Sequence, residues 1–352
     1  MTSRERYLAA LEHRNTDKVP FSWGLGVNRP VQNDLANRLG MNKEQFENWM
    51  DNMTDEMGVY PKYIGPKDLN RRKGSRTIDI WGVEREAVSY GAGHYDEIAY
   101  HPLAQAQTSA DLASHRWPSV DWFDFSELIP EKQLLDEPKA ILASNGNIFE
   151  CSWYMRGFEQ MFCDLLVDEE LAFEILSRVT QFHLSFFDRL LESAQGQIDV
   201  VFTADDLGGQ RGPLMSPMLW EQMIKPHHVR LDALIHSYGA KVMYHTDGAV
   251  MPFVEGLMDT GVDILEALQF DAADMDPVKL KAIGGDRLSF RGGISVQSTL
   301  PFGTADDVRQ EVRNRIAVLA NGGGYILAPS HAIQANTPVD NIFAMLEECG
   351  RM

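Results

Sequence analysis

Cysteine and long apolar runs are both scarce in this sequence. The three cysteines, Cys151, Cys163 and Cys349, form no CxxC pair, and their odd number and unrelated spacings give no disulfide framework. No apolar run approaches the roughly 20 residues that cross a bilayer. The first residues, MTSRERYLAALEH, also lack the continuous apolar stretch of a signal peptide. We therefore expect a cytoplasmic protein that does not enter a membrane.

Positive charge is also in short supply. The 32 Lys and Arg residues against 51 Asp and Glu residues give a formal net charge of −19. A surface this acidic repels the phosphates of nucleic acids and of anionic membranes, so neither is an expected partner. The same charge is typical of solubility alone, and it identifies no protein partner by itself.

The chain does contain a strand-then-helix rhythm, which is clearest in its second half. Short apolar runs that alternate with amphipathic segments are typical of a parallel sheet buried on both faces. Eight runs have strand length: residues 19–23, 59–64, 140–149, 198–204, 241–245, 263–267, 288–292 and 324–328. Eight strands close a barrel, and 352 residues exceed the roughly 250 that a (β/α)8 barrel needs. We therefore predict the α/β class and a (β/α)8 TIM barrel with an N-terminal helical segment.

Apolar residues at helical spacing follow several of these runs. The expected helices cover residues 217–237, 251–260, 276–283, 304–320 and 339–349, with Thr304 as an N-cap. Residues 65–125 break the rhythm: TIDIWGVEREAVSYG predicts a β-hairpin, and HRWPSVDWFDF predicts an aromatic-rich loop. We interpret this stretch as an insertion near the barrel mouth, within a single domain of residues 1–352. An open doubly wound sheet is the alternative, although Gly24 and Gly26 lack the third glycine of a dinucleotide fingerprint.

Four polar residues lie where predicted strands end, which is where barrel enzymes carry their catalytic groups. His245 ends one strand and is followed by Asp247, Glu266 comes 21 residues after His245, and His331 follows the last strand. Zinc accepts imidazole and carboxylate ligands, and two neutral imidazoles with two carboxylates balance its charge. We therefore predict a metal site on His245, Asp247, Glu266 and His331. An H-x-D pair is also typical of a hydrogen-bonded pair that only orients a loop.

A second group of residues is expected to contact substrate. Asp205 and Asp206 follow the strand 198–204 and precede two glycines, a place where backbone and ligand can approach closely. Either carboxylate can position substrate or handle a proton, although Asp is also a common helix cap. The remaining expected substrate contacts, which also suit barrel packing, are Trp23, Trp153, Tyr154 and Gln210.

These motifs also carry a resemblance to a known family. The segments RERYLAALEHRNTDKVPF, IDVVFTADDLGGQRGPLMSP, KVMYHTDGAV, RGGISVQSTLP and GGGYILAPSHAIQANTP resemble the uroporphyrinogen decarboxylase-like superfamily, essentially from end to end. The resemblance implies a (β/α)8 barrel, which agrees with the strand count, and a capacity to form homodimers. It also implies one of two chemistries: cofactor-free porphyrinogen decarboxylation, or zinc-dependent methyl transfer to or from a corrinoid.

Departures from the family pattern separate these two chemistries. The decarboxylases carry an arginine-bearing RQAGR-type stretch after the first strand, but the matching WGLGVNRP keeps only Arg29. His331 matches a decarboxylase histidine, whereas Trp153 stands where the family has tyrosine. In the corrinoid methyltransferases zinc is held by H-x-C and a later cysteine, with a glutamate nearby. His245 falls on that histidine, Asp247 on the first cysteine, Glu266 on the glutamate and His331 near the second cysteine.

The expected function is metal-dependent transfer of a methyl group from a small O-methyl compound, methoxyaromatics included, to a separate corrinoid protein. A site without thiolates is a harder Lewis acid, which suits an ether or alcohol oxygen better than a thiol. One alternative is a metal-free decarboxylase or lyase acting on a small acid, in which Asp205 or Asp206 stabilises a developing cation and His331 donates a proton. Another is a non-catalytic barrel that binds a corrinoid or tetrapyrrole.

Overall fold

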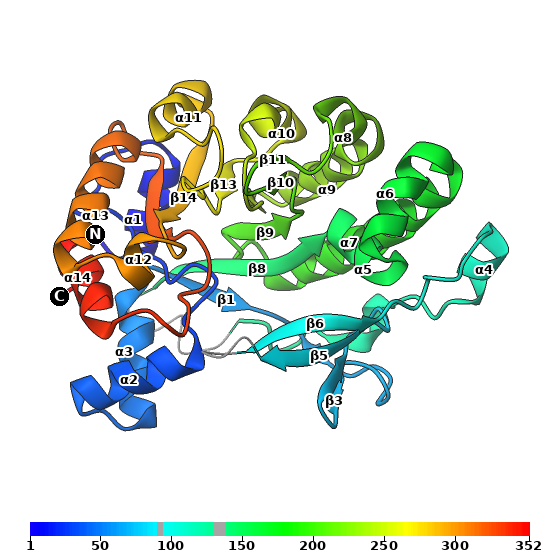
Figure 1. The fold of residues 1–352 in the computed structure, drawn as a ribbon, viewed down its shortest axis with the longest axis horizontal. Coiled ribbons are helices and arrows are strands. Elements are labelled where there is room, and N and C mark those ends of the chain that lie inside the picture. Colours follow the sequence, from blue (N-terminus) through cyan, green and yellow to red (C-terminus); the bar gives the residue numbers. More distant parts are fainter. Residues whose placement is uncertain (90–93, 130–137) are drawn as a thin grey trace.

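A curled sheet of parallel strands organises the fold (Figure 1). The structure is a computed structural model that describes residues 1–89, 94–129 and 138–352. Seven strands pair side by side and in parallel: β1 (Glu56–Val59), β8 (Ala140–Asn147), β9 (Val200–Ala204), β12 (Lys241–His245), β13 (Ile264–Glu266), β14 (Ser289–Ile294) and β15 (Tyr325–Pro329). The predicted α/β class with a TIM-like parallel sheet is confirmed.

Phe21 joins the two edges of this sheet. It forms an isolated parallel bridge with Leu327 of β15, and its carbonyl accepts a 3.0 Å hydrogen bond from the amide of Asp55, next to β1. The predicted strand 19–23 is therefore reduced to a single bridge residue, because the neighbouring Pro20 has no amide hydrogen to donate.

The second predicted strand, 59–64, is misplaced. The barrel strand is β1, which ends at Val59, and Lys62–Tyr63 (β2) instead pairs antiparallel with Phe123–Asp124 (β7) outside the barrel. Pro61 lies between β1 and β2 and cannot donate to a strand ladder, so one continuous strand is not possible here.

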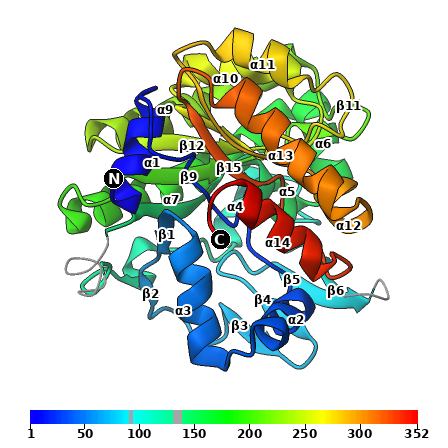
Figure 2. The same cartoon turned by 90° about the vertical axis from the view of Figure 1, so that its left-hand side faces the viewer.

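Helices lie around the parallel sheet, most of them on its outer side (Figures 1 and 2). They are α1 (Ser3–Leu11), α2 (Arg29–Leu39), α3 (Lys43–Met53), α4 (Ser109–Ser114), α5 (Phe149–Arg156), α6 (Phe158–Val167), α7 (Glu169–Ala194), α8 (Pro217–Met223), α9 (Lys225–Ser237), α10 (Val254–Thr260), α11 (Pro277–Gly284), α12 (Thr299–Phe302), α13 (Ala305–Leu319) and α14 (Val339–Glu348). Thr304 is the predicted N-cap of α13, and its side chain accepts from the amide of Asp307. The predicted helix 217–237 is split into α8 and α9, because Pro226 cannot continue the hydrogen-bond ladder of a preceding helix.

No helix among the described residues combines the length and the apolar composition that crossing a bilayer requires.

Two sets of apolar side chains hold the layers together. The larger packs the helices against the outer face of the sheet. The smaller fills the barrel interior, where Tyr7 and Leu11 of α1 contact inward-facing residues of five strands: Ala140, Leu142, Val200, Met243, Ile264 and Ile326. Helix α1 therefore lies against this interior packing, and the polar residues discussed next lie toward the opposite, carboxyl ends of the strands.

The stretch 65–125 contributes a four-stranded antiparallel sheet in the order β3 (Arg71–Lys73), β4 (Arg76–Ile78), β5 (Glu84–Ser89) and β6 (His94–Tyr100). The predicted hairpin corresponds to β4 and β5, while its last residues, 90 and 91, lie outside the described residues. In Figure 1 this sheet, in cyan, lies below the parallel strands, and helices α8, α10 and α11 lie above them. The final two-stranded element is formed by β10 (Gly208–Gly209) and β11 (Gly212–Pro213).

Candidate functional site

His245 and Glu266 are neighbours at the carboxyl ends of β12 and β13. The two residues are paired in the strand register, as are Met243 and Ile264 two positions earlier. Since side chains alternate along a strand and Met243 and Ile264 face the barrel interior, His245 and Glu266 face it too. The apolar packing of the barrel interior therefore gives way to a layer of polar side chains at the carboxyl ends of the strands.

Glu266 fixes one side of the His245 ring. It is fully buried, and one of its carboxylate oxygens is hydrogen-bonded to Nδ1 of His245. Its other oxygen lies 3.1 Å from Nη1 of Arg291 on β14. Arg291 in turn forms an ion pair with Glu56 on β1 and donates a 2.7 Å hydrogen bond to Ser22. This buried chain of charges leaves Nε2 as the nitrogen of His245 that can face a ligand.

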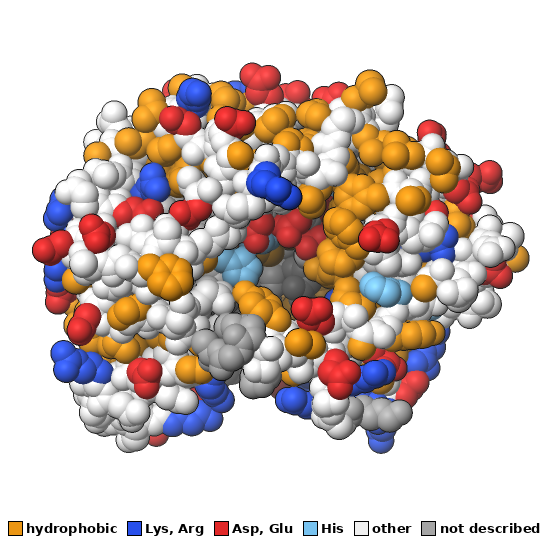
Figure 3. Space-filling model, viewed as in Figure 1, with side chains coloured by type: hydrophobic (Ala, Val, Ile, Leu, Met, Phe, Trp, Pro, Cys, Tyr) orange, Lys and Arg blue, Asp and Glu red, His pale blue; other side chains and the backbone are white. Residues whose placement is uncertain are grey.

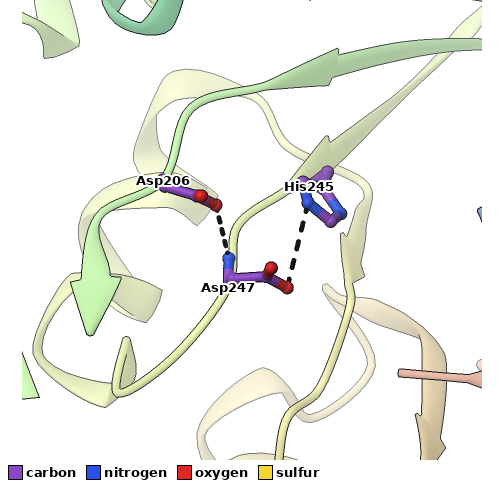
Figure 4. Close-up of side chains that lie close together, drawn as sticks. All are labelled: Asp206, His245 and Asp247. Atoms are coloured by element: carbon purple, nitrogen blue, oxygen red, sulfur yellow. Dashed lines mark hydrogen bonds and ion pairs between the residues drawn. The ribbon is translucent and has the colours of Figure 1, made fainter. Parts of the chain in front are cut away.

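Asp206 and Asp247 meet on the Nε2 side of that ring (Figure 4). Oδ1 of Asp206 accepts a 2.8 Å hydrogen bond from the amide of Asp247, and Oδ1 of Asp247 lies 3.9 Å from Nε2 of His245. Asp206, His245 and Asp247 each offer one ligand atom, and these atoms lie within 4.8 Å of one another. His331, after β15, brings Nε2 to 3.8 Å from Oδ2 of Asp247. Figure 3 shows a hollow in the middle of one face, with acidic side chains and a histidine on its wall.

Two glycines allow these loops to approach. A Cβ on Gly208 would lie 2.7 Å from the carbonyl oxygen of Asp247, and a Cβ on Gly248 would lie 2.5 Å from the carbonyl carbon of Gly208. Gly248 also has a φ of +82°, which favours glycine. The loop after β9, with Asp206, therefore contacts the loop after β12, with Asp247, backbone to backbone.

The site gathers more negative charge than the described side chains neutralise. Burial opposes the charged form of His245, but Glu266, with help from Asp247 and Asp206, raises its pKa to about 10. Burial and repulsion by Asp206 and Glu266 raise the pKa of Asp247 to about 7, although His245 acts in the opposite direction. Burial and the neighbouring charge of His245 lower the pKa of His331. A cation placed among these groups would relieve the repulsion between the carboxylates.

The donor set suits a divalent metal ion. Oδ1 of Asp247 is buried, and no described residue gives it a hydrogen bond, so it is a polar atom in need of a partner. One imidazole nitrogen and two carboxylate oxygens are ligands that zinc accepts, and a three-residue site leaves a position open for substrate. The structure brings together three of the four predicted ligands, His245, Asp247 and His331, and adds Asp206. Glu266 lies on the opposite side of the His245 ring.

The sequence of this chain matches a known protein family. Residues 132–352, which are 221 of the 352 residues, match the family model described as Uroporphyrinogen decarboxylase (URO-D). The chain belongs to the uroporphyrinogen decarboxylase (URO-D) family. This confirms the resemblance read from the sequence motifs.

Two curated relatives of this URO-D chain are called "Methylcobamide:CoM methyltransferase MtaA". The protein from Methanosarcina barkeri is 27% identical over 177 residues, which cover 50% of this chain and 48% of the relative. The protein from the Fusaro strain is 28% identical over 148 residues, which cover 42% of this chain and 40% of the relative. The URO-D chain thus matches less than half the length of these relatives.

A solved structure supports the fold over the full length. The structure titled "methyltransferase from Methanosarcina mazei" matches 99% of this URO-D chain and 98% of its own chain, with a TM-score of 0.68. Its sequence identity is 18%, so the similarity demonstrates the shared fold.

Asp205 lies apart from the cluster of Asp206, His245 and Asp247 in this URO-D chain. Its carboxylate accepts hydrogen bonds from the amides of Phe149 at 2.9 Å and Glu150 at 2.7 Å, at the start of α5. Nε2 of His228 on α9 lies 2.6 Å from the same carboxylate, and both side chains are fully buried. Asp205 therefore joins α5 and α9 to the end of β9, while its neighbour Asp206 faces His245.

The predicted substrate contacts of the URO-D chain are spread over several places. Tyr154 donates a 3.0 Å hydrogen bond to Glu150 and packs against Trp153, with 4.3 Å between ring centroids. Trp23 is buried and donates its indole N–H to the carbonyl of Met50 at 2.9 Å. The carbonyl of Gln210 accepts from the amide of Ala273 at 3.0 Å. Contact of these four residues with substrate stays a prediction.

Sequence reasoning missed two residues of the site in this URO-D chain, Glu150 and Arg291. Arg291 interrupts an otherwise apolar strand, LSFRGGI, and a buried arginine requires an acidic partner, so this pattern could have identified it. Glu150 is buried on α5, and burial together with repulsion by Asp206 and Asp205 raises its pKa to about 7. Nothing in the local sequence around Glu150 indicates that α5 carries it toward the acidic residues.

Proposed function

We propose that this chain is a metal-dependent methyltransferase that moves a methyl group from a small O-methyl compound to a corrinoid protein. Methoxylated aromatics are included among the donors. The observation that carries the proposal is the convergence of Asp206, His245 and Asp247 at the carboxyl ends of the strands. The names of the two relatives, which describe methyl transfer from a methylcobamide, support a corrinoid partner for this chain as well.

Asp206, His245 and Asp247 would hold a zinc ion, with His331 close enough to join them or to face the substrate. When bound, zinc would supply Lewis acidity toward the oxygen of the methyl donor. The absence of thiolate ligands favours an oxygen donor over a thiol acceptor. We assign Glu266 a positioning role behind His245, although the sequence pattern suggested that it binds the metal directly.

The remaining residues would prepare the site for the reaction. Glu266 and Arg291 hold the His245 ring so that Nε2 faces the substrate side. Because the pKa of His331 is lowered, its imidazole is largely neutral at pH 7, so it would act as a relay that takes a proton from water and passes it to the oxygen that loses its methyl group. Asp206 anchors the amide of Asp247, and Asp205 holds the start of α5 rather than the substrate.

Methyl transfer to cobalamin tests this function. Zinc-loaded protein is mixed with a methoxylated arene and cob(I)alamin, and formation of methylcobalamin is followed by its absorption. His245→Ala should abolish both metal content and transfer. His236→Ala is the matched control, since His236 is 40% exposed and pairs with Asp263 on the outer surface. Transfer that persists after the metal is removed would overturn the metal-centred function.

A further inference from the structure

Gly58 leaves the barrel interior open along β1. It is paired with Leu142 of β8 in the strand register, and Leu142 belongs to the apolar packing of the interior. Since paired residues of neighbouring parallel strands face the same side of a sheet, Gly58 faces the interior as well. Gly58 is exposed, and a Cβ placed on it would have no atom beyond its chain neighbours within 4 Å. The inner face of β1 therefore borders open space where a side chain would normally stand.

This open space lies toward the barrel mouth. Helix α1 closes the amino end of the interior with buried side chains. Glu56, two positions before Gly58 and on the same face of β1, forms an ion pair with Arg291, which also lies 3.1 Å from Glu266. Gly58 is further toward the carboxyl end of β1 than Glu56. The open position is therefore on the mouth side of the buried chain of charges that ends at Glu266.

Phe202 brings this space to the metal-binding residues. It lies on β9, packs against the apolar set of the barrel interior and keeps part of its surface exposed. Its ring centroid is 5.7 Å from that of His245, and the two ring planes are inclined by 30°. Because α1 closes the amino end of the interior, the exposed part of this inward-facing ring opens toward the mouth. A group that packs on this surface would therefore lie beside His245.

Gly58, Ser144 and Phe202 lie on three adjacent strands. Ser144 of β8 is paired with Phe202 in the register, so it faces the interior too, and it is partly exposed. Neighbouring strands are about 4.8 Å apart, which places the open position on β1 about 10 Å from the chain of β9, across β8. An aromatic ring fits this span, because it packs with its centroid about 5 Å from that of a second ring such as Phe202.

We propose that Gly58 and Phe202 select methyl donors that carry an aromatic ring, with the ring packed on Phe202 over Gly58 and the methoxy group directed toward His245 and Asp247. The identification of this ligand as the methyl donor rests on the proposed function. The ring-binding position itself rests on the open space at Gly58 and on the exposed surface of Phe202 beside His245. A donor without a ring, such as methanol, would leave this space unfilled.

Calorimetric titration of the full-length protein, supplied with zinc, with methoxybenzene tests the ring-binding position. Gly58→Leu and Ser144→Leu fill the space from two strands, and each should weaken binding more than about 10-fold. Met57→Leu is the matched control, because Met57 is paired with Ile141 on the outer face of the sheet. A thermal melt identifies any variant that does not fold. Wild-type protein that does not bind methoxybenzene, filled variants that bind it as tightly as wild type, or equal weakening by Met57→Leu would overturn the proposal.

The contact with Phe202 has its own test. Wild-type protein should bind methoxybenzene about 3- to 10-fold more tightly than methoxycyclohexane, because only the flat ring can pair with the aromatic ring of Phe202. Phe202→Leu should remove this preference. Because Phe202 also packs against His245, zinc content is measured in the variant and should stay at the wild-type level. An unchanged preference in zinc-loaded Phe202→Leu would contradict the role of Phe202.

Methyl transfer from methoxybenzene to cob(I)alamin separates this proposal from the proposed function. Binding that depends on Gly58 without any transfer by the wild type would refute the proposed function alone. Transfer at the wild-type rate by both Gly58→Leu and Ser144→Leu would refute the ring-binding position alone.

Discussion

Nδ1 of His245 is hydrogen-bonded to Glu266, and Nε2 of the same ring therefore faces Asp247 at 3.9 Å. The carboxylate behind the ring fixes both its tautomer and its orientation. In metal sites such a partner raises the basicity of the ligating histidine and is commonly required for tight binding.

Replacing Glu266 by Gln should therefore weaken zinc binding by about 10- to 100-fold while every direct ligand remains. Competition with a coloured chelator measures this affinity. Glu255→Gln, an exposed change on α10, is the control and should leave the affinity unchanged. Equal affinities of wild type and Glu266→Gln would contradict the positioning role of Glu266.

The close contact of Gly208 and Gly248 should affect the affinity for zinc as strongly as a direct ligand does. Gly248→Ala places a Cβ against the backbone of Gly208 and should separate Asp206 from Asp247, so the affinity for zinc should fall at least about 10-fold. Gly285→Ala separates this effect from backbone strain, because Gly285 also has a positive φ but faces open space. A similar loss of affinity in both variants would show that the contact between the loops is not the cause.

Asp205 and Asp206 are adjacent in sequence, but substitution of Asp205 should lower stability, whereas substitution of Asp206 should remove zinc binding. Asp205→Ala leaves two amides and His228 without their buried acceptor, so the free energy of unfolding should fall by about 3 kcal/mol. Asp206→Asn should change it by less than about 1 kcal/mol but should remove zinc binding. Urea unfolding and metal analysis of both variants check these two roles. An Asp205→Ala variant as stable as the wild type would contradict the structural role of Asp205.

Asp232 should make stability depend on pH. It is fully buried on α9, and burial raises its pKa to about 6, above the ordinary value of 3.8. Ionisation is therefore less favourable in the folded state, and the free energy of unfolding falls as pH rises from about 4 to about 6, by at most about 3 kcal/mol. About 1.4 kcal/mol of this loss lies between pH 5 and pH 8, given the same two pKa values.

Asp232→Asn removes this titration, so its stability relative to wild type should rise by about 1.4 kcal/mol between pH 5 and pH 8. Denaturant unfolding at both pH values measures the difference. Asp34→Asn, an exposed change on α2, should show no such trend. A constant difference between Asp232→Asn and wild type would show that Asp232 does not titrate in this range.

The sequence predicts the fold best where local patterns and packing agree. The strands that carry His245 and Glu266 are short apolar runs, and their burial in the barrel follows directly from that composition. The errors fall at proline: Pro20 reduces the first strand to one bridge, Pro61 ends the second, and Pro226 splits a helix.

The site could be predicted only in part. The position of His245, Asp247 and His331 after strands suffices to bring them to one end of a barrel. The turn of Asp206 toward His245, and of Asp205 away from it, depends on contacts with α5 and with the loop at Gly248. Those contacts join segments far apart in the chain, and no local pattern of residue types reports them.

Zinc content is the most direct test of the central claim. Protein purified without a polyhistidine tag is analysed for metal, with wild type beside His245→Ala. We expect about one zinc ion per chain in the wild type and its loss in the variant. Wild-type protein that holds no metal even after zinc is supplied would contradict the account, and the constellation around His245 would then belong to a metal-free lyase or a binding protein.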